Sequence, residues 1–235
     1  ISGYTNGAFS YTATDTGSGV SYLQYKKPGS SSWLSYTSGT TISSTATNGQ
    51  YQFRAVDKAG NVSDTQTIYL DSAAPTGTIK NSSGTAISGY TGGAFSYTAT
   101  DTGSGVSYLQ YKTPGSSSWT TYSSGTTISA SATNGLYQFR AVDNAGNTSA
   151  VSSIYLDTAI PTGRITDSNG TTVTTTTNKA FKYTASDGLS GIAYMQYKKP
   201  NSTVWETYAA GTLIQTTDTN GIYRFRAFDL SLIHI

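Results

Sequence analysis

The side chains best able to do chemistry in this chain are aspartates and asparagines, which stand in polar turns between apolar segments. Carboxylate, amide and backbone oxygens are the ligands that Ca²⁺ prefers, and extracellular modules bind it at roughly 10⁻⁴ to 10⁻³ M. We therefore hypothesise calcium at two places, where separate turns would have to meet. The first ligand set is Asp71, Asp101, Asp143 and Asn147, and the second is Asp157, Asp187 and Asp229. The alternative is that these residues only end strands and cap turns, which is their ordinary role.

The same residues do not assemble a catalytic set. Asp-Thr-Gly-Ser at 15–18 and 101–104 matches the signature of aspartic proteases, in which two carboxylates share a proton. The third copy reads Asp-Gly-Leu-Ser at 187–190, and each copy stands where a turn between strands is needed, so a turn is the better interpretation. His234 is the only His and Glu206 the only Glu, which leaves no triad base and no acid pair for glycoside hydrolysis. We expect no enzymatic activity.

Aromatic residues beside polar ones suggest a second kind of site. An alternating strand would place Tyr108 on the solvent face, next to Arg140 of a neighbouring strand, and such a strip could stack on a sugar ring. The candidate glycan-binding residues are Tyr22, Tyr108, Tyr194 and Arg140. The alternative is a solvated sheet face on which Arg lies over Tyr.

These residues recur because the chain is repetitive. Trp33, Trp119 and Trp205 follow one another at a constant interval of 86 residues. A unit of that size is a small domain. We divide the chain into repeat 1 at 1–72, which lacks its opening strand, repeat 2 at 73–158, which is complete, and repeat 3 at 159–229, which lacks its closing strand. Residues 230–235 depart from the pattern and resemble a translated adaptor sequence, so we expect a non-native tail.

The sequence of repeat 2 predicts short strands that are separated by turns. Its predicted strands are residues 78–80, 94–100, 106–112, 119–122, 126–129, 135–142 and 152–156. Several of them alternate apolar and polar residues, and no segment has a helical period. About seven such strands predict tandem antiparallel immunoglobulin-like β-sandwiches. In that fold the loops after the second and sixth strands lie at one end with the incoming linker, which would bring the first ligand set together.

The motif Gly-x-Tyr-x-Phe-Arg-Ala occurs in all three repeats and supplies expected structural residues. Tyr137 stands two positions before Phe139, the spacing of a tyrosine corner, in which the hydroxyl bonds back to the upstream backbone. The expected structural residues are Trp33, Tyr51, Phe53, Trp119, Tyr137, Phe139, Trp205, Tyr223 and Phe225.

The motifs together resemble a known class of module. They are Ser-Gly-Val at 104–106, Tyr-Lys at 111–112, Trp119, Gly-x-Tyr-x-Phe-Arg-Ala at 135–141 and Asp-x-Ala-Gly-Asn at 143–147. In this combination they are similar to bacterial immunoglobulin-like repeats, including OmpL47-like β-domains. The resemblance implies a non-catalytic module of a cell-surface or secreted protein.

The composition of the chain argues against several classes of function. Charged residues make up 11% of the chain, against about 25% in an average soluble protein. The net charge of +2 is scattered, which disfavours nucleic acid, and no apolar run approaches the ~20 residues of a membrane span. Cysteine is absent, which excludes disulfides and Cys-ligated metals.

We predict an extracellular stalk or adhesive segment whose partners are the neighbouring repeats and a host or environmental glycan or protein. The alternative is a carbohydrate-binding accessory module of a secreted glycan-active enzyme. The only cofactor that we consider is Ca²⁺.

Overall fold

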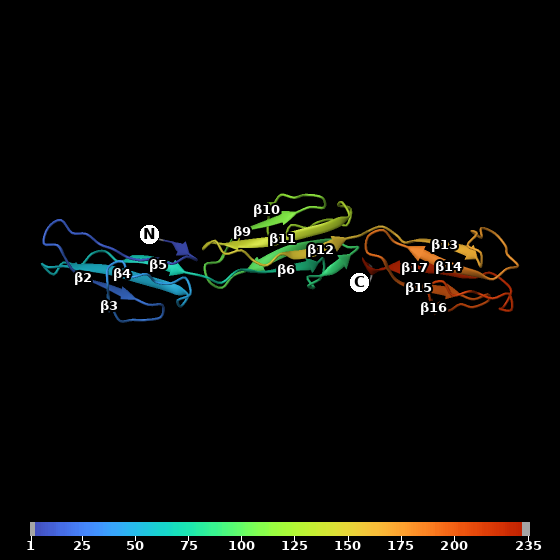
Figure 1. Cartoon of the computed structure of the whole chain (residues 1–235), viewed down its shortest axis with the longest axis horizontal. Coiled ribbons are helices and arrows are strands. Elements are labelled where there is room, and N and C mark those ends of the chain that lie inside the picture. The colour runs from blue at the N-terminus through green and yellow to red at the C-terminus, as the bar shows by residue number, and fades with distance from the viewer. Residues whose placement is uncertain (1–2, 232–235) are drawn as a thin grey trace.

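The computed structural model describes residues 3–231, and within that range the chain consists of β-strands and turns without an α-helix. The same residues include no helix with the length and apolar character needed to cross a bilayer. Three groups of strands lie end to end along one long axis, as Figure 1 shows. The predicted all-β chain of tandem, largely antiparallel β-sandwiches is thereby confirmed.

The strands follow the 86-residue period. Repeat 1 contains β1 (Tyr4–Thr5), β2 (Val20–Lys26), β3 (Leu34–Tyr36), β4 (Gly49–Asp57) and β5 (Gln66–Leu70). Repeat 2 contains β6 (Thr76–Asn81), β7 (Gly89–Thr91), β8 (Phe95–Thr100), β9 (Val106–Lys112), β10 (Thr120–Tyr122), β11 (Gly135–Asp143) and β12 (Ser152–Leu156). Repeat 3 contains β13 (Thr162–Asp167), β14 (Phe181–Ser186), β15 (Ile192–Lys198), β16 (Glu206–Tyr208) and β17 (Arg224–Asp229).

Repeat 2 forms two facing sheets. One pairs β6 with β8, and the other has the order β10-β9-β11-β12-β7. The pairings are antiparallel except that of β7 with β12, which is parallel. Across the interior β6 contacts β11 and β12, which closes the sandwich. The short strand β7 has no counterpart among the predicted strands.

The core of repeat 2 comes from inward-facing residues of both sheets. Phe139 on β11 is fully buried, stacks on Tyr97 at 5.0 Å between ring centroids and meets the edge of Tyr122 at 5.1 Å. Burial of side chains of this size stabilises a fold by about 1.5–3 kcal/mol each. Tyr137 donates a 3.0 Å hydrogen bond to the Thr133 carbonyl, four residues upstream. Tyr51 and Tyr223 make the same bond in their own repeats.

The strand predicted at 126–129 is wrong, and a tyrosine hydroxyl explains why. The segment pairs with β8 only through a bridge between Phe95 and Ile128. Between the two segments lies the Tyr122 hydroxyl, which accepts the Tyr97 N–H at 3.0 Å and donates to the Thr126 carbonyl. A side chain therefore occupies the place of one ladder position. Tyr36 and Tyr208 make the corresponding bonds in repeats 1 and 3.

Each repeat has its own hydrophobic core. The three clusters of buried residues fall between positions 9 and 70, 79 and 156, and 183 and 214. The boundaries at 72 and 158 stay predictions. Of the tail predicted to be non-native, residues 232–235 lie outside the described residues. Ser231 donates its N–H to Asp229 at 3.0 Å, and its carbonyl accepts the Gly92 N–H at 3.1 Å.

We expect Tyr122→Phe to lower the free energy of unfolding by about 1–3 kcal/mol, because it leaves the buried Tyr97 N–H and the partly buried Thr126 carbonyl without their shared partner. The control is Tyr97→Phe, which removes a buried hydroxyl that has no hydrogen-bond partner among the described residues. That change should be close to neutral. Chemical denaturation of both variants checks this, and an equal loss of stability would contradict the role given to the Tyr122 hydroxyl.

Candidate functional site at the junction of repeats 1 and 2

The linker between repeats 1 and 2 carries a fully buried carboxylate. Asp71 directly follows β5 and has 0% of its surface exposed. One carboxylate oxygen accepts the Ser104 N–H of repeat 2 at 2.6 Å, and the other accepts the N–H of Ala73 at 3.1 Å. A charged group is almost never buried unless its hydrogen bonds are made. The linker is therefore fixed to the loop after β8.

The opposite side of the linker is fixed to repeat 1. Ser72 donates both its N–H and its hydroxyl to the Asn48 side-chain oxygen, at 3.1 and 3.0 Å. Thr158 makes the same two bonds to Asn134 at the end of repeat 2. The residue next to the buried aspartate is thus bonded to the repeat that precedes it.

The loop after β8 fits closely against Asp71 because it contains a glycine. A Cβ added to Gly103 would overlap all three terminal atoms of the Asp71 carboxylate. Within the loop, Asp101 accepts the N–H groups of Gly103 and Gly105 at 3.0 and 2.7 Å. The small residue is required here by the approach of the linker carboxylate.

The turn after β11 completes the junction. Asp143 is 2% exposed, and its carboxylate accepts the backbone N–H and the side-chain amide of Asn147, each at 2.8 Å. The same amide nitrogen of Asn147 donates to the Asp71 backbone carbonyl at 2.8 Å. One asparagine therefore joins repeat 2 to the linker. In repeat 1 the equivalent pair is Asp57 and Asn61, and the Asn61 side chain is the main cause of a lowered pKa at Asp57.

The structure brings the carboxylates of Asp71, Asp101 and Asp143 together, with ligand atoms within 4.8 Å of one another. Among residues 3–231 no Lys or Arg forms an ion pair with any of the three. Two like charges at this separation repel by roughly 3 kcal/mol at an effective dielectric constant of about 20. The N–H donors satisfy hydrogen bonds but bring no full positive charge. Three clustered carboxylates are a ligand set that suits a hard divalent cation.

The second predicted ligand set does not meet in the same way. Asp157 is fully buried and accepts the Ser190 N–H at 2.9 Å, as Asp71 does with Ser104. Among the described residues, however, Asp157, Asp187 and Asp229 form no group of the closeness seen at the first junction. The position equivalent to Gly103 is Leu189.

Two carboxylates of that second set are directed to local donors. Asp229 accepts the N–H and hydroxyl of Ser231 at 3.0 and 2.7 Å, because no Asp-x-Ala-Gly-Asn turn follows it. Burial raises the pKa of Asp187, but the N–H groups of Leu189, Gly191 and Ser190, together with the Asp157 side chain, outweigh it and hold that pKa below its ordinary value. The second set is therefore a hydrogen-bonded joint.

The predicted aromatic strip lies on the outer face of the larger sheet. Tyr22, Tyr108 and Tyr194 are 51%, 47% and 43% exposed. Arg140 lies over the Trp119 ring at 4.4 Å and donates to Gln110 at 2.9 Å. Lys112 is 4.8 Å from the same ring. Trp33 and Trp205 have equivalent cation neighbours. Trp119 thus packs over the sheet beneath two cationic side chains, and Tyr108 is the more exposed aromatic residue.

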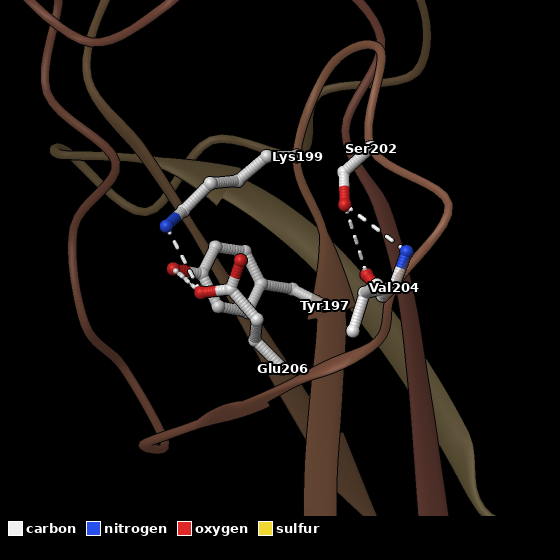
Figure 2. A network of polar contacts seen from close by, with 5 residues as sticks. All are labelled: Tyr197, Lys199, Ser202, Val204 and Glu206. Carbon is white, nitrogen blue, oxygen red and sulfur yellow. Dashed lines mark hydrogen bonds and ion pairs between the residues drawn. The ribbon is translucent and has the colours of Figure 1, made fainter.

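The only glutamate lies in a surface network of repeat 3, which Figure 2 shows. Lys199 forms an ion pair with Glu206 at 2.9 Å, and the Tyr197 hydroxyl lies 3.4 Å from the same oxygen. The hydrogen bond that Lys199 donates to Glu206 is the main cause of a raised pKa at Lys199. Exposed pairs of this kind contribute little to stability. Within residues 3–231 no second carboxylate takes part in this network.

Comparison with known proteins gives matches to solved structures of low sequence identity. No protein-family model and no curated protein matches the chain. Fibronectin(III)-like modules of CbhA from Clostridium thermocellum match with 17% identity over 66% of this chain and 86% of theirs, at a TM-score of 0.31. The FN1–FN3 domains of chicken CNTN1 match with 15% identity over 94% of this chain and 83% of theirs, at a TM-score of 0.28. The fold rests on the strands and contacts described above, and these matches assign no function.

Proposed function

We propose that the chain is a non-catalytic spacer segment of a bacterial cell-surface or secreted protein, in which successive β-sandwiches are held in line by stiff junctions. The observation that carries the proposal is the burial of Asp71 between two repeats. Domains joined by short polar linkers move relative to one another by default. Here the linker makes hydrogen bonds to both of its neighbours, so the orientation of each repeat is passed to the next.

A fixed orientation is what a spacer needs. Each repeat adds its own length to the spacer only if the junction does not fold back. The three groups of strands in Figure 1 lie along a single axis. The aspartates at 71 and 157 occupy the same place in successive repeats and accept the N–H of the equivalent serine. The same hydrogen bond between linker and serine therefore occurs at both junctions.

The experiment is a distance measurement between repeats 1 and 2. Spin labels are placed on cysteines introduced at the exposed positions Ser31 and Ser117, which is direct because the chain has no other cysteine. We expect a narrow distance distribution that broadens in Gly103→Ala, since the added methyl group displaces the Asp71 carboxylate. Gly17→Ala is the matched control, because its Cβ meets nothing closer than 3.7 Å. A wild-type distribution as broad as that of Gly103→Ala would overturn the spacer proposal.

We propose further that Ca²⁺ stiffens the first junction through Asp71, Asp101 and Asp143. Clustered carboxylates, two of them buried, are supported by N–H donors but not by a basic side chain among the described residues. A divalent cation would remove their mutual repulsion and would bind the folded junction only. Binding to the folded state alone stabilises a protein in proportion to the logarithm of the ligand concentration.

Calorimetric melting of the whole chain tests the metal. Millimolar Ca²⁺ should raise the midpoint by a few degrees relative to a chelator, as roughly 1 kcal/mol does for a domain of this size. Asp101→Asn should abolish the increase, whereas Asp15→Asn, the same loop position in repeat 1, should retain it. Equal midpoints with Ca²⁺ and with chelator would show that hydrogen bonds alone hold the junction.

Glycan binding is a second candidate function, favoured by the exposure of Tyr22, Tyr108 and Tyr194 at one place in each repeat. A flat tyrosine beside amide and guanidinium groups presents both a stacking face and hydrogen-bond donors. Arg140 is already engaged with Gln110 and Trp119, so the tyrosine would carry the contact.

A glycan array distinguishes this candidate from a pure spacer. Binding should be lost when Tyr22, Tyr108 and Tyr194 are all replaced by Ala, and it should be kept in Tyr155→Ala, a change at another exposed tyrosine of repeat 2. Absence of binding to every glycan would remove the candidate and leave the spacer proposal intact.

A further inference from the structure

Two tyrosines stand directly opposite each other on the outermost strand pair of the larger sheet of repeat 2. Tyr90 on β7 is the register partner of Tyr155 on β12, and the two strands are parallel. The rings are stacked, with 5.3 Å between their centroids and 28° between their planes. Tyr155 is 38% exposed, and Tyr90 is partly exposed. The two phenol rings therefore lie against each other at the surface.

Repeat 1 has the same pair of tyrosines at the same place. Tyr4 on β1 is the parallel register partner of Tyr69 on β5, and their ring centroids are 5.6 Å apart. Tyr4 is exposed, and Tyr69 is partly exposed. The pair therefore recurs with the period of the array, and in repeat 3 the position of Tyr90 is taken by Thr176.

The other tyrosine pairs among the described residues are built differently. Each contains Tyr36, Tyr122 or Tyr208, which are 7%, 4% and 4% exposed. The hydroxyl of each of these three residues donates to a backbone carbonyl. Tyr22 and Tyr108 are well exposed, but no other tyrosine ring contacts them within residues 3–231. The two surface pairs alone combine ring contact with access for a reagent.

The paired tyrosines connect two strands that tension along the array would shear. β7 lies near the start of repeat 2, and β12 ends one residue before the linker aspartate Asp157. Because the strands are parallel, a pull on the two ends of the repeat drives them past each other. Three residue pairs form the ladder between them. Each hydrogen bond of such a ladder contributes only about 0.5–1.5 kcal/mol. The chain has no cysteine for a disulfide that would reinforce the pair.

We propose that Tyr90 with Tyr155, and likewise Tyr4 with Tyr69, are sites of oxidative cross-linking that form dityrosine within one chain. The oxidant is an external one-electron oxidant, namely hydrogen peroxide acting through a haem peroxidase. Each phenol loses one electron and one proton, and the two phenoxyl radicals couple through ring carbons next to the hydroxyls. The hydrogens on these carbons then move to the oxygens, which restores both phenols. In sum the pair loses two hydrogen atoms, and one peroxide becomes two waters.

The test is oxidation of the whole chain in dilute solution with a haem peroxidase and hydrogen peroxide, followed by peptide mapping of the monomer. Trypsin releases Tyr155 as the only tyrosine of residues 141–164 and Tyr69 as the only tyrosine of residues 59–80. We expect both peptides to be cross-linked, to Tyr90 and Tyr4 respectively, with the fluorescence of dityrosine and the loss of two hydrogen atoms for each link. Cross-links found only in dimers, or only at other tyrosines, would overturn the proposal.

Matched variants separate the pair from general oxidation of the surface. Tyr155→Phe should remove the cross-link of repeat 2 and leave that of repeat 1. Tyr108→Phe changes an exposed tyrosine that has no tyrosine partner, and it should leave both cross-links at the wild-type yield. A cross-link from Tyr90 that persists in the Tyr155→Phe monomer at the wild-type yield would contradict the assignment.

Single-molecule force extension of the oxidised chain gives a second readout. The residues between Tyr90 and Tyr155 stay in a closed loop after cross-linking, so unfolding of repeat 2 should release about a quarter of its chain length. The Tyr155→Phe chain treated in the same way should release the full length of that repeat. An oxidised wild-type repeat 2 that also extends fully would show that no bond joins β7 to β12.

Discussion

The arrangement of this chain depends on the burial of a linker carboxylate. Asp71 and Asp157 are both fully buried, and each accepts the N–H of a serine in the repeat that follows. A buried charge that loses its donors destabilises a protein by several kcal/mol. Any rotation of one repeat against the next would break these bonds. The orientation of the repeats is thus linked to the stability of the loops that receive the carboxylate.

The two junctions share a scaffold but differ in the residues that surround the linker carboxylate. At the first, Gly103 allows the linker to approach, and three carboxylates lie within 4.8 Å. At the second, Leu189 stands at the position of Gly103, and the described residues include no equally close group of three carboxylates, although Asp187 accepts N–H groups of its own loop as Asp101 does. The hydrogen bond from serine to linker survives in both. We infer that the hydrogen-bonded joint is common to both junctions, whereas the close group of three carboxylates, on which the calcium proposal rests, occurs among the described residues at the first junction.

Much of the fold could be predicted because its signals are local. The alternation of apolar and polar residues, together with the turn residues, predicted the exact bounds of β9 and β12. The strand order of the immunoglobulin fold predicted that Asp71, Asp101 and Asp143 lie close together. The strand expected at 126–129 does not form, since the Tyr122 hydroxyl takes a ladder position, and no sequence period reports such a bond. The difference between the two junctions could not be predicted from the sequence either, because it depends on how closely the linker carboxylate approaches the carboxylates of the next repeat. The one signal in the sequence was the presence of Leu189 at the position that Gly103 occupies in repeat 2.

Residual dipolar couplings of the backbone amides in the intact chain test the central claim most directly. If the linker carboxylate fixes the junction, repeats 1 and 2 share one alignment tensor, with the same magnitude and principal axes. Tensors that differ in magnitude or direction between the two repeats would mean that the sandwiches reorient independently. That result would contradict the account of the chain as a stiff array.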